Sequence, residues 1–216
     1  MRKAFLPAIP VLILCVSLVF YFSQQGQPET IMLDGITWTE VLYWNFKDGL
    51  YPDGWGWGEW DIVDGLLEGR DSEGEFSVYF FPFTHGGDFL LETKFMFIEG
   101  LNSDVEVQLL TRDSSEINFE SGMVLFAGRK EVTVRHMANK IDYVYRPFSM
   151  NLNIDYGRWY VIRFIVHSGT VRAFVNETQV YASNKSYPVG EYHEPHLAVR
   201  HAVARFEYVQ VYVPAG

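Results

Sequence analysis

The chain lacks several features that would point to particular classes of protein. Its single cysteine, Cys15, lies in an apolar run near the N-terminus, so the rest of the chain forms no disulfide and must depend on its core. It has 17 basic residues against 27 acidic ones, a formal net charge of −10. Because nucleic-acid binding needs a concentrated basic surface, nucleic acid is not expected as a partner.

Helical and catalytic motifs are also scarce. After residue 30 there is no long amphipathic helix and no internal repeat of fixed period. No nucleophile elbow, phosphate-binding glycine loop or His/Cys spacing for zinc occurs. The stretch from His193 to His196 reads as a loop and is only a weak metal candidate. These motifs therefore predict no cofactor.

One long apolar run extends from Ala4 to Phe22 behind a positively charged start. As a helix it would span about 28 Å, close to the roughly 30 Å hydrocarbon core of a bilayer. The positive flank places the N-terminus in the cytoplasm and the folded domain outside. We expect a retained single-pass anchor over 1–22, with cleavage as a signal peptide and secretion as the alternative. A tether and entry strand follow over 23–41, and a folded domain over 42–214.

Alternating apolar residues predict β-strands through the folded domain. Phe89, Leu91, Phe95 and Phe97 share one face of a strand, whereas Glu92 points the other way. The same pattern recurs in the next segment and near the end of the chain, where the apolar positions are Val105, Val107, Leu109, Tyr160, Ile162, Phe164 and Val166. The loop over 99–104 predicts a hairpin between the first two of these strands.

The closing region from Gly157 to Val213 reads as strand, tight turn, strand, turn, loop and strands. Ser168-Gly169 and Asn176-Glu177 supply the turns. Short strands separated by Gly, Asn and Asp turns favour a sandwich or jelly roll.

Two stretches carry a resemblance to a known family. The patterns F-x-D-G, beginning at Phe46, and W-x-I-x-D-G-x-L-x-G, beginning at Trp60, resemble the opening of concanavalin A-like lectin/glucanase domains. The closing strands resemble the usual ending of such domains, among them laminin-G-like and 3-keto-disaccharide hydrolase-type jelly rolls. The resemblance implies an all-β, concanavalin A-like jelly-roll sandwich of two antiparallel sheets, here preceded by one N-terminal transmembrane helix. The first and last strands are expected to pair.

A polar strand face is the first candidate binding site. If the predicted hairpin forms, one face carries Glu92, Lys94, Glu106, Gln108 and Arg112. The resemblance implies a concave sheet that holds a glycan, whose hydroxyls these side chains would bind. Glu92 with Glu106 is then the best catalytic pair. The alternative is an ordinary solvated face with cross-strand ion pairs.

A second candidate is the pair Arg200 and His201. In the hydrolase-like relatives the penultimate strand carries a polar residue near the place of His201, which would act as a general base or bind the ligand. Arg135-His136, Tyr143 and Tyr145 are grouped with it as ligand-binding candidates. The alternative is that His201 is a structural strand residue.

Tryptophans form a third candidate in Gly54-Trp55-Gly56-Trp57-Gly58, followed closely by Trp60. Exposed rings would stack on the C–H faces of sugars, whereas buried rings would join the core. A third possibility is an apolar surface resting near the membrane, because Trp prefers the interface.

The acidic stretch Glu59 to Asp64 looks like the E-x-D-x-x-E signature of family 16 glycoside hydrolases, in which paired carboxylates cleave the sugar bond. Glu59 with Asp61 is the second-choice catalytic pair. The favoured alternative is a strand that ends in the turn Asp64-Gly65. Calcium at the sandwich edge is also implied by the resemblance, with Asp48, Asp61 and Asp64 as oxygen ligands.

The prediction for function is a membrane-anchored, extracytoplasmic domain that binds a glycan or cell-surface polysaccharide without cleaving it. A glycoside hydrolase-like enzyme and a structural cell-surface subunit that binds protein partners are the alternatives. The sequons at Asn176 and Asn184 are candidate glycosylation sites on an exported surface.

Overall fold

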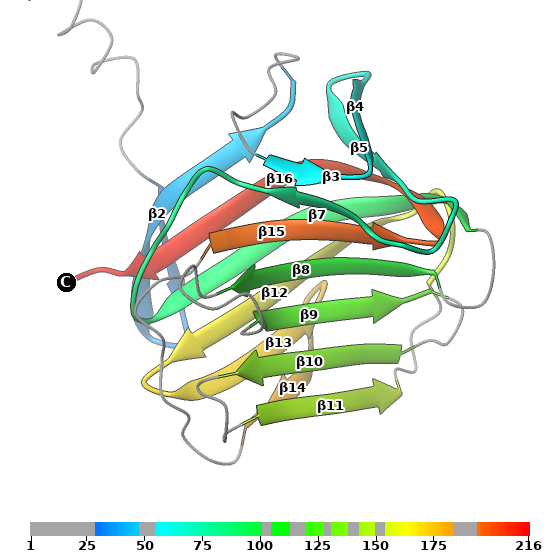
Figure 1. Cartoon of the computed structure of the whole chain (residues 1–216). Coiled ribbons are helices and arrows are strands. Elements are labelled where there is room, and N and C mark those ends of the chain that lie inside the picture. Colours follow the sequence, from blue (N-terminus) through cyan, green and yellow to red (C-terminus); the bar gives the residue numbers. More distant parts are fainter. Residues whose placement is uncertain are drawn as a thin grey trace, which may run out of the picture.

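The computed structural model describes residues 29–47, 55–100, 105–112, 120–127, 131–137, 143–149, 154–183 and 194–216. For Trp55, Glu120, 135–137 and 143–149 it describes the backbone alone. These residues form two antiparallel sheets that pack face to face (Figure 1). No helix in the described part of the chain is both long and apolar enough to cross a membrane, and the apolar run over 4–22 lies outside it.

The larger sheet has nine strands within the described residues. Its main order is β1 (Thr30–Leu33), β2 (Ile36–Asn45), β16 (Ala202–Pro214), β7 (Phe89–Gly100), β12 (Trp159–His167), β13 (Thr170–Val175) and β14 (Thr178–Ala182). A hairpin of β4 (Glu59–Val63) and β5 (Leu66–Arg70) pairs with the first part of β16, next to β2. We call this the nine-stranded sheet.

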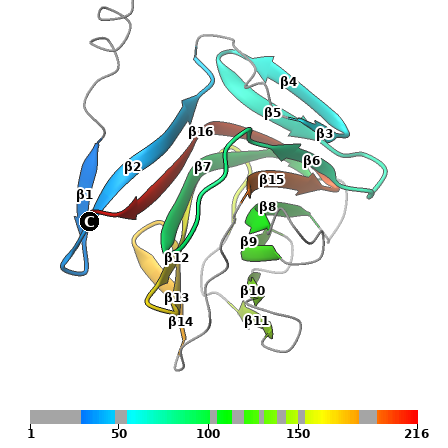
Figure 2. The same ribbon diagram turned by 60° about the vertical axis from the view of Figure 1, so that its left-hand side comes forward.

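The second sheet has seven strands within the described residues. Its order is β11 (Tyr143–Ser149), β10 (Glu131–Met137), β9 (Glu120–Phe126), β8 (Glu106–Arg112), β15 (Glu194–Arg200), β6 (Ser77–Phe80) and β3 (Trp55–Trp57). Figure 2 shows it as a separate layer beside β16, β7 and β12. We call it the seven-stranded sheet.

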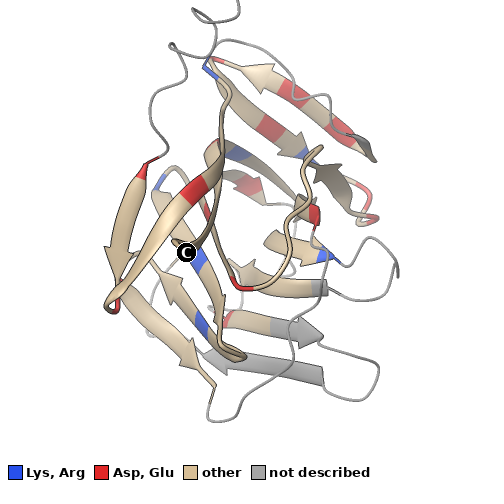
Figure 3. Ribbon diagram, turned by 90° about the vertical axis from the view of Figure 1, so that its left-hand side faces the viewer, with Lys and Arg blue, Asp and Glu red and all other residues tan. Residues whose placement is uncertain are grey.

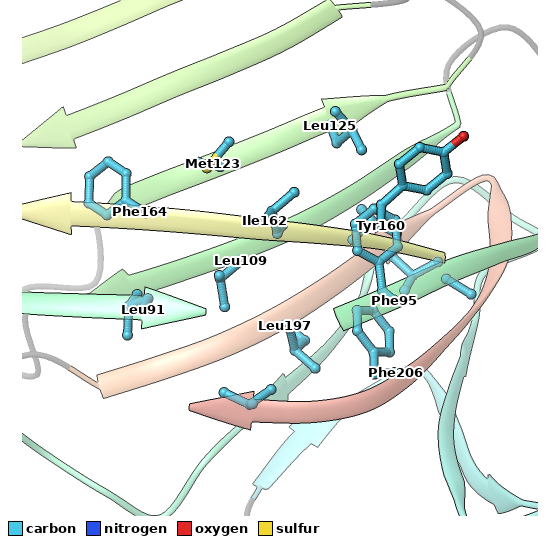
Figure 4. Packing of buried hydrophobic residues seen from close by; sticks show 14 of the residues in the cluster. Leu91, Phe95, Leu109, Met123, Leu125, Tyr160, Ile162, Phe164, Leu197 and Phe206 are labelled. Atoms are coloured by element: carbon cyan, nitrogen blue, oxygen red, sulfur yellow. The ribbon is translucent and has the colours of Figure 1, made fainter. Parts of the chain in front are cut away.

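The core lies between the two sheets and confirms the alternation predicted from the sequence. The predicted inward faces of β7, β8 and β12 are fully buried in one cluster. Figure 4 shows Phe95, Tyr160 and Phe206 of the nine-stranded sheet packed near Leu197 and Leu125 of the other. Each fully buried large apolar side chain contributes roughly 1.5–3 kcal/mol, so this interface supplies most of the stability.

The C-terminal strands follow the predicted order. The turns at Ser168-Gly169 and Asn176 have the positive φ angles that tight hairpins require (49°, 73° and 53°). The Oδ1 atom of Asn176 accepts a hydrogen bond from the backbone N–H of Val161 at 3.0 Å. The last strand, β16, pairs with β2 and β5 as expected.

The predicted hairpin across 99–104 is wrong. β7 pairs with β12 and β16 in the nine-stranded sheet, whereas β8 pairs with β9 and β15 in the seven-stranded sheet. The chain therefore crosses from one sheet to the other after Gly100. Alternation is the same in both arrangements, because each strand still turns its apolar face to the shared core.

A second, smaller apolar cluster lies on the outer face of the nine-stranded sheet. Trp38 of β2 is fully buried there against Leu90, Ile165 and Tyr212. At the tip of the β1–β2 hairpin, Asp34 forms an ion pair with Arg172 of β13. The sheet therefore begins at Thr30, inside the segment 23–41 that was predicted to hold the tether and an entry strand, and its first hairpin covers part of its outer face.

Candidate functional site

A row of side chains crosses the outer face of the seven-stranded sheet. Trp57, Val78, Ala198 and Gln108 lie directly opposite one another on β3, β6, β15 and β8. Four strands spaced about 4.8 Å apart set a span of roughly 14 Å. Because Val78 and Ala198 are small, the middle of the row is low, and a hollow of about 190 Å³ lies between Trp57 and Gln108. We call it the first hollow.

Aromatic rings line one side of the first hollow. Phe80 and His196 form the next cross-strand pair, with ring centroids 4.7 Å apart. The Trp57 ring lies 5.8 Å from Phe80, and the guanidinium of Arg112 lies 4.1 Å over the Phe80 ring. Arg112 is held in place because its Nε donates a 2.8 Å hydrogen bond to the Glu194 carboxylate.

A buried carboxylate lies beside the other side of the row. Glu106 is 4% exposed and sits opposite Arg200. Its Oε2 accepts a hydrogen bond from Gln108 Nε2 at 2.8 Å, and its Oε1 accepts one from Arg200 at 3.2 Å. The carboxylate is therefore paired with both neighbours, and its bond from Gln108 fixes the position of that amide in the row.

The loop over 71–76 forms a wall of the site. The buried Asp71 accepts hydrogen bonds from the backbone N–H groups of Glu73 and Gly74, and from that of His201 at 2.7 Å. Arg200 Nε donates to the Gly74 carbonyl at 3.2 Å, and its guanidinium lies 4.9 Å over the Phe76 ring. A Cβ at Gly74 would collide with the ring of His201. The loop is thus fixed to the corner where β15 turns into β16.

Glycines explain how Trp57 is presented. A Cβ on Gly56 would collide with the Val78 carbonyl, and one on Gly58 would collide with Ser77. Without a Cβ, both glycines allow the chain at β3 to approach β6 closely within the sheet. Trp57 is left 50% exposed, whereas Trp60 is half-buried and packs against the core rings of Tyr79 and Phe206.

Comparison with known proteins identifies the fold. No protein-family profile and no curated protein sequence matches the chain. An endo-beta-1,3-glucanase from Pyrococcus furiosus matches with a TM-score of 0.69 and 12% identity, covering 88% of this chain and 99% of that one. The carbohydrate-binding module CBM66 from Bacillus subtilis matches with a TM-score of 0.57 and 16% identity, covering 72% and 92%. The chain has the concanavalin A-like jelly-roll fold. At these identities the likeness establishes the fold alone, and it confirms the resemblance found in the sequence.

In this jelly roll, the proposed face of five polar residues is divided between the two sheets. Glu92 and Lys94 lie on the outer face of the nine-stranded sheet, away from Glu106, Gln108 and Arg112. Glu92 and Glu106 therefore share no cleft, and the prediction that they form a catalytic pair is wrong. The error follows from the crossing between sheets after Gly100.

Glu92 belongs to a closed polar network. It is 7% exposed, accepts a hydrogen bond from Arg163 Nε at 2.6 Å and accepts another from the Tyr208 hydroxyl at 2.8 Å. Burial, with the negative charge of Glu92, raises the pKa of Tyr208 well above its ordinary value. Lys94 forms an ion pair with Glu207 and lies 5.1 Å from the Trp159 ring. Both residues stabilise the sheet.

His201 does not lie on the penultimate strand. It occupies the corner between β15 and β16, with a φ of 50°, and its ring packs on the loop over 71–76. The expectation that it faces the concave sheet is wrong, because the strand ends one residue earlier. Arg200 does face the site. The side chains of Arg135, His136, Tyr143 and Tyr145 lie outside the described residues, although their backbones belong to β10 and β11.

The acidic stretch is an edge hairpin, as the favoured alternative predicted. Glu59 and Asp61 are exposed on β4, and Asp64-Gly65 forms a tight turn with φ angles of 54° and 74°. Among the described residues, no group of three His, Cys, Asp or Glu side chains is placed to hold a metal ion. Asp48 lies outside the described residues.

Several site residues were missed by sequence reasoning. His196 was assigned to a loop, but Glu194 and His196 lie on β15, and His193 lies outside the described residues. Phe80, Val78 and Ala198 were not recognised at all. Alternation within the short strands β6 and β15 would have placed them on the outward face. Of the two sequons, Asn176 is half-buried in its turn, and Asn184 lies outside the described residues.

Proposed function

We propose that the outer face of the seven-stranded sheet binds carbohydrate and does not cleave it. The observation that carries this proposal is the half-exposed ring of Trp57 at one end of a hollow whose other end is the Gln108 amide. An aromatic ring packs on the C–H face of a sugar, and an amide donates to and accepts from its hydroxyls. Such an arrangement of apolar surface with a few placed polar groups is typical of ligand sites.

Known proteins of this fold support the proposal. The matched structures include a carbohydrate-binding module and the carbohydrate recognition domain of Emp47p, which matches with a TM-score of 0.59 and 12% identity over 79% of this chain and 94% of that one. They also include beta-glucanases. Sugar recognition is common to both groups, whereas cleavage belongs to only one of them.

The carboxylates of the site favour binding over cleavage. Retaining glycosidases need two carboxyl groups about 5–5.5 Å apart, one of them acting as a nucleophile. Both oxygens of Glu106 already accept hydrogen bonds, and the outward position two residues later is Gln108, an amide. Glu75 is exposed on the wall of the same hollow and is a candidate for a second carboxylate there.

Affinity electrophoresis of the full chain tests the proposal. The chain is kept in a detergent without a sugar headgroup, since alkyl glucosides or maltosides would compete for the site. Gels contain laminarin, lichenan, inulin or dextran. We expect retardation by at least one polysaccharide and a clear loss of it in Gln108→Leu. A folded chain that none of them retards would overturn the proposal and favour a structural subunit.

Release of reducing sugar from the same polysaccharides separates binding from hydrolysis. We expect no release by the wild-type chain. Release that disappears in Glu106→Gln would instead establish the glycoside hydrolase-like alternative. A Glu177→Gln variant, altered in an exposed turn between β13 and β14, controls for the loss of one negative charge.

For location, we infer that 4–22 holds the domain at the outer side of a cell membrane. The apolar length and the positive flank of this run support that inference. Alkaline carbonate extraction of membranes tests it: an anchored chain stays with the membrane fraction. A folded chain found in the medium without its N-terminal segment would indicate cleavage and secretion instead.

A further inference from the structure

A second hollow adjoins the first. It has a volume of about 420 Å³ and extends from Trp57 along the loop over 71–76 to Glu59 and Arg70 of the β4–β5 hairpin. Trp57, Glu75 and Phe76 line both hollows. The exposed indole therefore stands at the passage between them, where a ligand that extends beyond the first hollow would have to run.

The walls of this passage are held in place without a ligand. The Asp71 carboxylate accepts hydrogen bonds from the backbone N–H groups of Gly74 and of His201 at the sheet corner. Arg200 donates one to the Gly74 carbonyl, and its guanidinium covers the ring of Phe76. On the opposite side, Gly58 has no Cβ and lies in close contact with Ser77. The Ser77 hydroxyl accepts a hydrogen bond from the Glu59 N–H at 3.1 Å. A site with fixed walls loses little conformational entropy on binding.

The second hollow is strongly acidic, in contrast to the first. Its lining includes one basic side chain and four carboxylates, namely Arg70, Glu59, Asp71, Glu73 and Glu75. Glu59, Glu73 and Glu75 are exposed and bring their charge to the surface of the hollow. Figure 3 shows acidic segments recurring along the β4–β5 hairpin beside it.

We propose that a glycan chain occupies both hollows, passing between Trp57 and the loop that carries Glu75 and Phe76, and that the acidic second hollow restricts the ligand to glycans without carboxylate or sulfate groups. The inference rests on the proposed function. Sugar hydroxyls donate hydrogen bonds to carboxylates, so an uncharged chain satisfies this lining. A uronic acid or sulfate in the same place would meet like charges well within the screening length of about 10 Å at 0.1 M salt.

Matched polysaccharides test the charge restriction. Laminarin, lichenan, inulin and dextran are each compared with a carboxymethylated form, and with a hydroxyethylated form of equal substitution that controls for bulk. At low ionic strength we expect the full chain to bind a carboxymethylated form about tenfold more weakly than its hydroxyethylated counterpart. The difference should shrink in 1 M salt, where the screening length falls to about 3 Å.

Charge removal from the second hollow provides the decisive variant. The carboxymethyl penalty is the factor by which the carboxymethylated form binds more weakly than the hydroxyethylated form. In Glu59→Gln/Glu73→Gln we expect this penalty to fall to about threefold, because two of the carboxylates are gone. Glu177→Gln should retain the full penalty, since its charge lies in the β13–β14 turn, several strands away from the β4–β5 hairpin. The ratio of the two affinities is compared, so a change in the overall strength of binding does not affect the result.

Competition by oligosaccharides tests occupancy of both hollows. Laminaribiose is compared with laminarihexaose, and the disaccharides with the hexasaccharides of the cello- and isomalto- series. For the series that competes, we expect the hexasaccharide to be at least about tenfold more potent, because it alone reaches past Trp57. Equal potency would show that the ligand occupies a single hollow, and would overturn the claim that a glycan chain occupies both.

The outcomes separate this inference from the proposed function. Equal binding of hydroxyethylated and carboxymethylated forms, or a penalty unchanged in Glu59→Gln/Glu73→Gln, would overturn the charge restriction and leave carbohydrate binding intact. Failure of every polysaccharide and oligosaccharide to bind a folded chain would overturn both.

Discussion

The outer faces of the two sheets carry cross-strand rows of different residues and have opposite character. On the nine-stranded sheet, Arg163, Glu92, Gln210 and Tyr43 stand opposite one another on four strands, and long polar side chains meet across them. On the seven-stranded sheet, the corresponding row has Val78 and Ala198 in its middle. Long side chains with cross-strand partners close a face, whereas small ones between an exposed ring and an amide leave it hollow.

The largest expected effect is on the closed face. Glu92→Ala leaves Arg163 and Tyr208 without their buried carboxylate, so the free energy of unfolding should fall by about 3–5 kcal/mol. Chemical denaturation measures this loss. Lys94→Ala, at a more exposed ion pair with Glu207, should cost less than about 1 kcal/mol. Glycan binding should persist in both variants while they are folded; its loss in folded Glu92→Ala would make the nine-stranded face part of the site.

The next effect is on the open face. Trp57→Ala removes the exposed ring and should raise the Kd for the polysaccharide by about thirtyfold, or about 2 kcal/mol, as is usual for a central aromatic contact. Titration calorimetry measures it. Tyr43→Ala is the matched control, since Tyr43 is 45% exposed on the other sheet. Equal losses of affinity in the two variants would contradict the assignment of binding to one face.

High pH should weaken the closed face selectively. Burial and the charge of Glu92 raise the pKa of Tyr208 above its ordinary value of 10.0. The stabilisation is therefore complete below about pH 10 and is lost as the pH rises above it, where the unfolded chain releases the proton and the folded chain retains it. Between pH 9.5 and 11 we expect the unfolding free energy of the wild-type chain to fall more steeply with pH than that of Tyr208→Phe. The difference in slope should approach that of about one proton released on unfolding. Parallel curves would show that Tyr208 does not contribute.

Low pH should have the smallest effect, at the β5–β16 junction. Burial alone would raise the pKa of Glu68, but hydrogen bonds from Arg205 and Arg70 lower it below its ordinary value of 4.5. This stabilisation is present above about pH 4.5 and disappears as the pH falls through the lower folded-state pKa. Glu68→Gln should make the stability depend less on pH over this range, as measured by the midpoint temperature of thermal unfolding from pH 6 to pH 3. Glu177→Gln should leave it unchanged.

Much of the fold was predictable because its signals are local. The strands β12, β13 and β14 follow from alternation, and the turns at Ser168-Gly169 and Asn176 follow from residues that accept positive φ. The pairing of β16 with the start of the domain came from the family resemblance. No local signal distinguished a hairpin after β7 from a crossing to the second sheet.

The candidate site was predictable only in pieces. Trp57, Gln108, Arg112 and Arg200 were predicted as ligand-binding residues and do lie on one face, with Glu106 beside them. Val78 and Ala198 were missed because their importance is the space they leave between neighbours on other strands. Nothing in their own short segments indicates that space.

The sequence by itself determined which side chains of each strand point inward, since alternation is a property of the extended backbone. It also determined the tight turns, because Gly, Asn and Asp accept conformations that other residues avoid. Only the tertiary structure decided which outward rows share a sheet, since the crossing after Gly100 separates Glu92 from Glu106. It likewise decided where the hollow lies, because four strands distant in the sequence must meet before Trp57 and Gln108 can face one another across Val78 and Ala198.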